Sequence, residues 1–294
     1  MTDSAGAGGA GLAGPPPVSA LEIERRAYRS RRALRSVLIS LVSTLVFAVV
    51  MAIVLVNSPG WQATRDTFFD PQYFQRALPL VGKGLLLNIQ VLFVAVFGVA
   101  IMALLLASLR SLRGPVFFPL RFLAAAYTDL FRGLPFIIVL YLIGFGVPAL
   151  GITTGIIPVA LLGTVALVLT YSSYVAEVLR SGIEAVHPSQ RLAARSLGLS
   201  HYRSLWLVEL PQAVRKVTPA LMNDFVSMQK DVGLISVLGA VDAVRAAQIQ
   251  VATTYNYTAY VVAGLLFVAL SWPFIRFTDW LSARQRAREQ IAGL

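Results

Sequence analysis

The chain has 294 residues, of which 57% are hydrophobic and only 13% are charged, about half the charged share of a soluble domain. This composition excludes an ordinary water-soluble globule and indicates that lipid is the solvent for most of the chain. The 25 Lys and Arg residues outnumber the 14 Asp and Glu residues, but they alternate with long apolar runs, which favours membrane topology over nucleic-acid binding.

The first 56 residues are predicted to form a tail followed by a membrane helix. Residues 1–35 are interpreted as a disordered, basic cytoplasmic tail, because they begin with Gly, Ala and Pro and lack apolar periodicity there. Residues 36–56 carry no charge, and their apolar stretch is longer than the roughly 7–15 residues of a signal peptide. No A-x-A cleavage site follows before Pro59, so we expect a retained transmembrane helix.

The rest of the chain is predicted to cross the membrane five more times. Residues 57–79 come first, as an extracytoplasmic loop that is either a short helix on the membrane surface or a plain apolar loop. Five apolar segments then have the length of about 20 residues that a hydrocarbon core requires. These segments are residues 80–109, 122–147, 156–178, 217–238 and 257–277. A basic cytoplasmic tail, 279–294, completes an all-α fold, a polytopic membrane helix bundle with six transmembrane helices.

The distribution of Lys and Arg predicts the orientation of this bundle. With the N-terminus in the cytoplasm, nineteen of the 25 basic residues fall on the cytoplasmic side and four on the opposite side. Cytoplasmic loops carry the excess of Lys and Arg in membrane proteins, so both termini are predicted to be cytoplasmic. The longest cytoplasmic connection is then residues 181–216.

Within the loop 181–216, residues 191–207 are predicted to form two short helices joined by a turn. Pro188 after His187 suits a helix start, and Gly198 is placed as the left-handed residue that ends the first helix. Small alanines beside an apolar ridge leave a surface that the groove of a partner can approach closely. The spacing leaves a second interpretation open, in which the two helices pack on the membrane end of the protein itself.

Several sequence blocks in and around this loop share the pattern of a known family. Three of them are YVAEVLRSGI at 174–183, QRLAARSLGL at 190–199 and VELPQAVR at 208–215. They resemble the EAA loop of ATP-binding-cassette importer permeases, and more narrowly that of the polar amino-acid permease branch. The blocks YTDLFRGLP at 127–135 and NDFVSMQKD at 223–231 agree in type and order, so the resemblance covers roughly residues 80–277.

The resemblance implies a five-helix type I importer core over residues 80–278, with the helix at 36–56 as an N-terminal addition. It also implies a coupling helix that docks into a cleft of a cytoplasmic ATPase and converts closure of the ATPase into a rocking motion of the bundle. The residues that the resemblance assigns to this contact are Gln190, Leu192, Ala193, Ala194, Leu197, Gly198, Leu199 and Pro211. The chain departs from the family at Leu192, where Glu is usual, so the ATPase contact of that Glu has no equivalent side chain here.

The chain is predicted to be a transport subunit and not an enzyme. It has no G-x-x-x-x-G-K-[ST] phosphate loop, so ATP and Mg²⁺ are expected on a separate partner subunit and no cofactor is expected on this chain. The lack of cysteine excludes thiol catalysis, and two histidines argue against a multi-histidine metal centre. The H-E-x-x-H and G-x-S-x-G motifs of hydrolases are also missing.

Charged residues inside the predicted spans nominate the substrate pathway, because such residues are costly in lipid and normally face protein or water. Lys230 and Asp231, together with the adjacent Gln229, are assigned to this pathway. Neighbouring residues on a helix do not face each other, whereas a zwitterionic amino acid offers a partner to each charge. In the alternative interpretation, Lys230 extends outward to the membrane surface and Asp231 pairs with another helix.

Two further pairs of charges are spaced i,i+3 and can meet on one helix face. Asp129 and Arg132 stand close to Pro135, which removes a helical hydrogen bond, so this pair either lines the pathway or fixes helix packing. Glu177 and Arg180, at the cytoplasmic edge, are expected to form a structural pair or part of an inner gate.

The sequence therefore predicts the membrane-spanning permease subunit of an ATP-driven polar amino-acid importer in a bacterial cytoplasmic (inner) membrane. The expected partners are an ATP-binding-cassette ATPase dimer, a second permease subunit that is identical or homologous, an extracytoplasmic amino-acid-binding protein and membrane lipid, but not nucleic acid. The alternative is a stand-alone secondary amino-acid transporter or channel, which would need coupling carboxylates or an inverted repeat.

Overall fold

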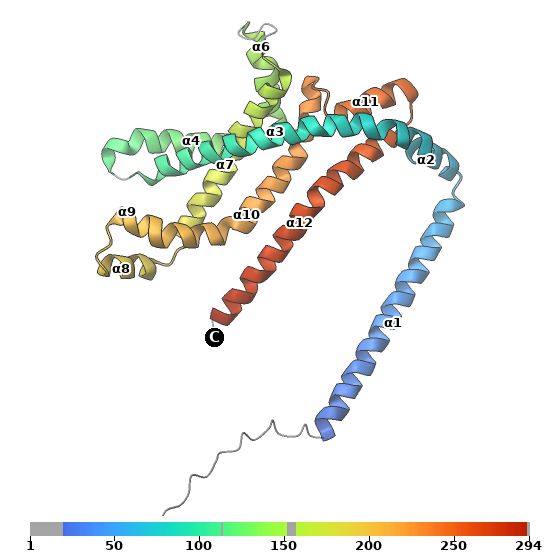
Figure 1. Ribbon diagram of the computed structural model, residues 1–294, viewed down its shortest axis with the longest axis horizontal. Coiled ribbons are helices and arrows are strands. Elements are labelled where there is room, and N and C mark those ends of the chain that lie inside the picture. Colours follow the sequence, from blue (N-terminus) through green and yellow to red (C-terminus); the bar gives the residue numbers. More distant parts are fainter. Residues whose placement is uncertain (1–19, 113, 152–156, 293–294) are drawn as a thin grey trace, which may run out of the picture. The chain divides into compact units, whose positions relative to one another are not determined.

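The structure is a computed structural model that describes residues 20–112, 114–151 and 157–292 (Figure 1). Throughout these ranges the regular elements are helices, and no strand occurs in them. The chain divides into two compact units, residues 1–63 and residues 64–294. The predicted all-α class is confirmed.

Helix α1 (Ala20–Val56) is the main element of the first unit. Its part from Arg32 to Val56 is long and apolar enough to cross a membrane, in agreement with the helix predicted at 36–56. The helix begins at Ala20, so residues 20–35 are helical rather than disordered, because Ala, Leu, Glu and Arg, which favour helices, dominate this segment. The remainder of the predicted tail, residues 1–19, lies outside the described residues.

Helices α2 (Trp61–Phe68) and α3 (Pro71–Ser111) occupy most of the segment expected to be an outer loop. Of the two alternatives for 57–79, the short helix is therefore the one that forms. Helix α3 begins at Pro71 rather than near residue 80, because Asp70 caps it: one carboxylate oxygen accepts from the N–H groups of Gln72 (2.7 Å) and Tyr73 (3.2 Å). Proline suits the first helical position, which needs no N–H donor.

The segment predicted as one span at 122–147 is bent in the structure. The 3₁₀ turn η1 (Pro115–Phe117) leads into α4 (Phe118–Gly133), and α5 (Phe136–Tyr141), η2 (Leu142–Gly146) and α6 (Val147–Ala149) continue at an angle of 105° to it. Leu134 is extended at the bend, with φ −93° and ψ 134°. Pro135 lacks an N–H and excludes the residue before it from helical geometry, which explains the position of the break.

Helix α7 (Val159–Glu184) is the helix around which the second unit is built. It packs against α3, α4 and α5 and against the later helix α10, as Figure 1 shows for the crossing of α3 and α7. Its apolar face meets α3 and the segment directly after α10 in a core that contains Ala95, Leu167, Val232 and Ile235. Gly163 lies so close to Ile235 that a Cβ atom there would come within 2.7 Å of its side chain, so a small residue permits this crossing.

The last third of the chain forms a loop of short helical elements, followed by two long helical segments. The loop consists of α8 (Pro188–Ser196), α9 (His201–Ser204) and the π-helical turn η3 (Leu205–Glu209). Helix α10 (Leu210–Asp231) continues through the 3₁₀ helix η4 (Val232–Leu238) and then bends by 49° into α11 (Ala243–Thr254), which the sequence did not predict. Helix α12 (Thr258–Ala292) is continuous, so the predicted tail at 279–294 is helical up to Ala292.

Four helices of the described chain are individually long and apolar enough to span a membrane, and the number rises to six if each bent pair counts as one span. The four are α1, the segment Trp61–Ser111, α7 and α12; the bent pairs are α4 with α5–α6 and α10 with α11. A polytopic membrane bundle is confirmed, and the predicted number of six agrees with the upper count.

Candidate functional site

The loop between α7 and α10 folds as two short helices, as the spacing predicts. We call residues 188–209 the coupling segment. His187 caps α8, with its Nδ1 atom accepting from the N–H of Ser189 (3.2 Å), and Pro188 takes the first helical position. Gly198 ends α8 in the left-handed conformation, with φ +79°. The N–H of Leu199 then donates to the carbonyl of Ala194 (3.2 Å), which closes the helix end as a glycine stop usually does.

A buried ion pair holds the two halves of the coupling segment together. Glu209 in η3 is only 3% exposed, and its carboxylate lies 2.8 Å from Nε of Arg191 in α8. The hydroxyl of Ser204 donates to the same carboxylate (3.1 Å), and Arg191 also donates to the carbonyl of Ile183 at the end of α7 (2.6 Å). The sequence does not reveal this pair, because Arg191 and Glu209 lie in different helical elements and local spacing does not link them.

The structure separates the predicted ATPase-contact residues into an outer and an inner set. Leu192 is 65% exposed and Leu197 is 82% exposed, so two large apolar side chains point away from the chain. The exposed set also includes Gln190, Ala193, Gly198 and Pro211, while Leu199 is half-buried. Ala194, in contrast, is 4% exposed and packs against its own chain, so its side chain is not part of the outward-facing surface.

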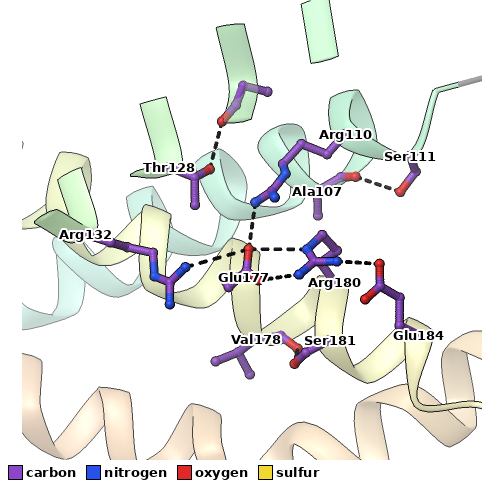
Figure 2. A network of polar contacts seen from close by, with 11 residues as sticks. Ala107, Arg110, Ser111, Thr128, Arg132, Glu177, Val178, Arg180, Ser181 and Glu184 are labelled. Carbon is purple, nitrogen blue, oxygen red and sulfur yellow. Dashed lines mark hydrogen bonds and ion pairs between the residues drawn. The ribbon is translucent and has the colours of Figure 1, made fainter. Parts of the chain in front are cut away.

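Glu177 of α7 lies at the centre of a cluster of arginines that comes from three helices. Its carboxylate lies 2.7 Å from Arg110 of α3, 2.5 Å from Arg180 of α7 and 3.9 Å from Arg132 of α4. Figure 2 shows the three arginine side chains directed at it. Arg180 also pairs with Glu184, one turn further along α7. The predicted pairing of Glu177 with Arg180 is confirmed, and the network additionally fastens α3 and α4 to α7.

The expected pair of Asp129 with Arg132 does not form. Arg132 turns towards Glu177, and Asp129 is exposed, without an ion-pair partner among the described residues. The reason is geometric: the end of α4 packs against α7, so the half-buried carboxylate of Glu177 competes successfully with the exposed one of Asp129. Arg110, which lies just beyond the span predicted at 80–109, makes the shorter of the two interhelical contacts of Glu177.

The three consecutive residues proposed for the pathway point in different directions. Lys230 is exposed, whereas Asp231 accepts a hydrogen bond from the hydroxyl of Tyr171 in α7 (2.8 Å). Gln229 is fully buried and accepts a hydrogen bond from Ser271 of α12. Gln229 therefore fixes the contact of α10 with α12, and the structure does not bring it together with Lys230.

A buried polar contact at the start of α11 was missed in the sequence. Asn88 of α3 donates to the carboxylate of Asp242 (2.9 Å) and to the carbonyl of Val232 (3.2 Å), and it accepts from the N–H of Ala243 (3.0 Å). Asp242 in turn caps α11 by accepting from the N–H of Arg245 (2.8 Å). Asn88 is one of the few polar residues in a mainly apolar span, and such residues usually bond between helices, which is the indication that could have revealed it.

These contacts equip the chain to transmit movement and to position charges, but they do not form a metal centre. Within the described ranges, no group of three or more His, Cys, Asp or Glu side chains could hold a metal ion.

Comparisons with known proteins agree with this arrangement. The family described as "Binding-protein-dependent transport system inner membrane component" matches residues 112–287. The probable amino-acid ABC transporter permease protein y4tG of Sinorhizobium fredii is 39% identical over 61% of this chain and 75% of its own length. The arginine transport system permease protein ArtQ of Bacillus subtilis is 33% identical over 66% of this chain and 86% of its own length.

A solved structure gives the same result for the fold. The crystal structure of an amino acid ABC transporter with histidines contains a chain that is 32% identical, with a TM-score of 0.66, and the match covers 73% of this chain and 98% of that one. The resemblance read from the sequence is confirmed. This chain belongs to the family of binding-protein-dependent transport system inner membrane components and is a permease subunit of an ATP-binding-cassette importer.

Proposed function

We propose that this permease imports a polar amino acid through an inner membrane, driven by ATP that is hydrolysed on separate subunits. The substrate class is supported by the names of the relatives, which include permeases for arginine and for amino acids in general. ATP and Mg²⁺ would bind the partner ATPase, so this chain itself needs no cofactor.

The observation that carries the proposal is the coupling segment, which presents Leu192 and Leu197 outward from helices joined by a buried ion pair. An exposed apolar surface of this kind is suited to a partner's cleft. The ion pair of Arg191 with Glu209 ties α8 to η3, and η3 continues directly into α10. A displacement of α8 by a closing ATPase dimer would therefore move α10 as well.

Helix α10 leads from the coupling segment to the residues proposed for the pathway. Asp231, at the end of α10, accepts a hydrogen bond from Tyr171 of α7, so a movement of α10 would also act on α7 at this point. Lys230 is exposed there and is free to meet the carboxylate of an amino acid. Nucleotide can drive the exchange between inward-open and outward-open states only by binding one of them better.

We further propose a set of partner subunits and a membrane orientation for this chain. Two permease subunits, identical or homologous, would surround one pathway, with two ATPase subunits at the coupling segments and an amino-acid-binding protein on the opposite side. Both termini would lie in the cytoplasm, since the excess of Lys and Arg favours this side. The helix α1 would be an addition to the five-span core.

Uptake into proteoliposomes tests the proposal. The chain would be reconstituted with its ATPase and permease partners and with the binding protein, and labelled arginine, glutamine, glutamate and leucine would be compared. We expect uptake of a polar amino acid that requires ATP and the ATPase. Uptake by the permease alone, without nucleotide, would contradict the proposal and favour a stand-alone transporter.

A further inference from the structure

A cavity of about 380 Å³ lies behind the coupling segment, between the last turns of α3 and α7 and the stretch from α9 to the first turns of α10. Its wall is apolar, with contributions that include Leu104, Leu179 and Leu205. Of the two serines in the wall, Ser111 already donates its hydroxyl to the carbonyl of Ala107 (2.8 Å). A cavity of this character suits a hydrocarbon ligand, and its volume lies in the range of about 300–1,000 Å³ typical of ligand pockets.

The cavity opens at the surface of the bundle. Tyr202 and Trp206 in its wall are both more than half exposed, and their rings lie 6.0 Å apart. Leu104 and Val214, also in the wall, are exposed as well. Trp and Tyr are typical of the level of the lipid headgroups, where one side of the ring is apolar and the other meets water. The mouth of the cavity therefore has the composition of a membrane interface.

Three arginines are bonded to, or directly follow, residues of the cavity wall. Arg121 donates to the carbonyl of Leu112 in the cavity wall (3.0 Å). Arg203 and Arg215 directly follow the wall residues Tyr202 and Val214 and are both exposed.

The carboxylates near the mouth are already neutralised by other arginines. Glu177 pairs with Arg110 and Arg180, Glu184 pairs with Arg180, and Glu209 pairs with Arg191. The rim consequently keeps a positive charge, and a positive rim at the membrane surface attracts anionic lipids.

We infer that this cavity binds one acyl chain of an anionic phospholipid, whose phosphate lies against Arg121, Arg203 or Arg215. The lipid fills the space between the coupling segment and the ends of α3 and α7, and so supports the inner side of the segment that faces the ATPase. This site is independent of the substrate pathway and of the identity of the transported amino acid.

Quenching of Trp206 fluorescence tests the inference, because this side chain is part of the cavity wall. The full chain, with Trp61, Trp272 and Trp280 replaced by Phe, would be reconstituted in vesicles containing phosphatidylglycerol or phosphatidylcholine with brominated acyl chains. We expect phosphatidylglycerol to quench at about fivefold lower mole fraction, since one arginine near the membrane surface favours an anionic lipid by about this factor. Equal quenching by both lipids would overturn the inference.

Two variants separate the cavity from general contact with the bilayer. Ser108→Phe fills the cavity and should abolish selective quenching, whereas Ser43→Phe on α1 should leave it unchanged. The triple variant R121Q/R203Q/R215Q keeps the apolar wall and should reduce the preference for phosphatidylglycerol to near onefold, while R276Q, at an exposed arginine outside the rim, should retain it. Selective quenching that persists in both test variants would overturn the site, as would its loss when the ATPase and second permease assemble on the chain.

Discussion

The base of the coupling segment is a single buried ion pair. Glu209 is almost completely enclosed, and Arg191 supplies its only cationic partner among the described residues. A charge in such a position is tolerated because its partner and the hydroxyl of Ser204 satisfy it. At the scale of residues, this side-chain contact with η3 therefore helps to fix the direction of α8, in addition to the backbone of the loop.

Arg191→Ala should destabilise the chain by about 3–5 kcal/mol, because it leaves the buried carboxylate of Glu209 without a counter-charge. Arg195→Ala, in the same helix but exposed, should change stability by less than about 0.5 kcal/mol. Thermal unfolding of the purified variants measures the difference. Equal melting temperatures would show that the ion pair does not hold the segment.

Gly198→Ala should be destabilising by about 1–2 kcal/mol, since its φ of +79° places a Cβ atom against the backbone. The matched variant Gly264→Ala lies in α12 with open space around the new Cβ and should be neutral or stabilising by up to about 1 kcal/mol. The two effects have opposite signs, so unfolding measurements on both variants distinguish them. A neutral Gly198→Ala would mean that the left-handed stop is not required.

Residues that act within one or two turns of a helix could be predicted from the sequence, and others could not. The stop at Gly198 and the pair of Glu177 with Arg180 depend on local geometry, which spacing reports directly. Arg110 meets Glu177, and Asn88 meets Asp242, only after helices far apart in the sequence have packed. No periodicity links such partners, and for the same reason the pairing of Asp129 with Arg132 was wrongly expected.

At the scale of elements, the two bends decide the shape of the second unit. Both occur where the backbone loses helical hydrogen bonds: at Pro135, and between η4 and α11, where Gly239 is left-handed with φ +93°. Hydropathy identifies the apolar stretches on either side of each bend but contains no information on the angle between them. It also missed the ends of α1 and α12, which extend beyond their apolar windows because helix-favouring polar residues continue them.

The bend before α11 provides a test at this scale. Asp242→Ala removes the cap of α11 and should weaken this helix by at least about 1 kcal/mol, whereas Asp242→Asn keeps a capping oxygen and should cost less. Hydrogen exchange of the amides at the start of α11 measures the effect. Faster exchange in Asp242→Asn than in Asp242→Ala would contradict the role assigned to Asp242.

At the scale of the whole molecule, the distribution of basic residues implies that the coupling segment and the loop after α11 lie on opposite sides of the membrane. Figure 1 shows α8 and α11 at opposite ends of α10. The chain has no cysteine, so single cysteines can be introduced without background. Leu197 and Tyr255 are matched positions, because each is 82% exposed.

In right-side-out vesicles, a membrane-impermeant maleimide should label Tyr255→Cys but not Leu197→Cys. Inverted vesicles should give the reverse, because the excess of Lys and Arg predicts a cytoplasmic position for residue 197. Labelling of both positions from one side would contradict the proposed orientation.

Docking of the coupling segment on an ATPase is the central claim, and site-directed crosslinking tests it most directly. Membranes containing the full transporter would be treated with a short cysteine-to-lysine crosslinker, using Leu197→Cys and, as the control of equal exposure, Tyr255→Cys. The account predicts a crosslinked product of permease and ATPase from position 197 and none from position 255. A product from position 255 alone, or from neither position in a transporter that still imports its substrate, would contradict it.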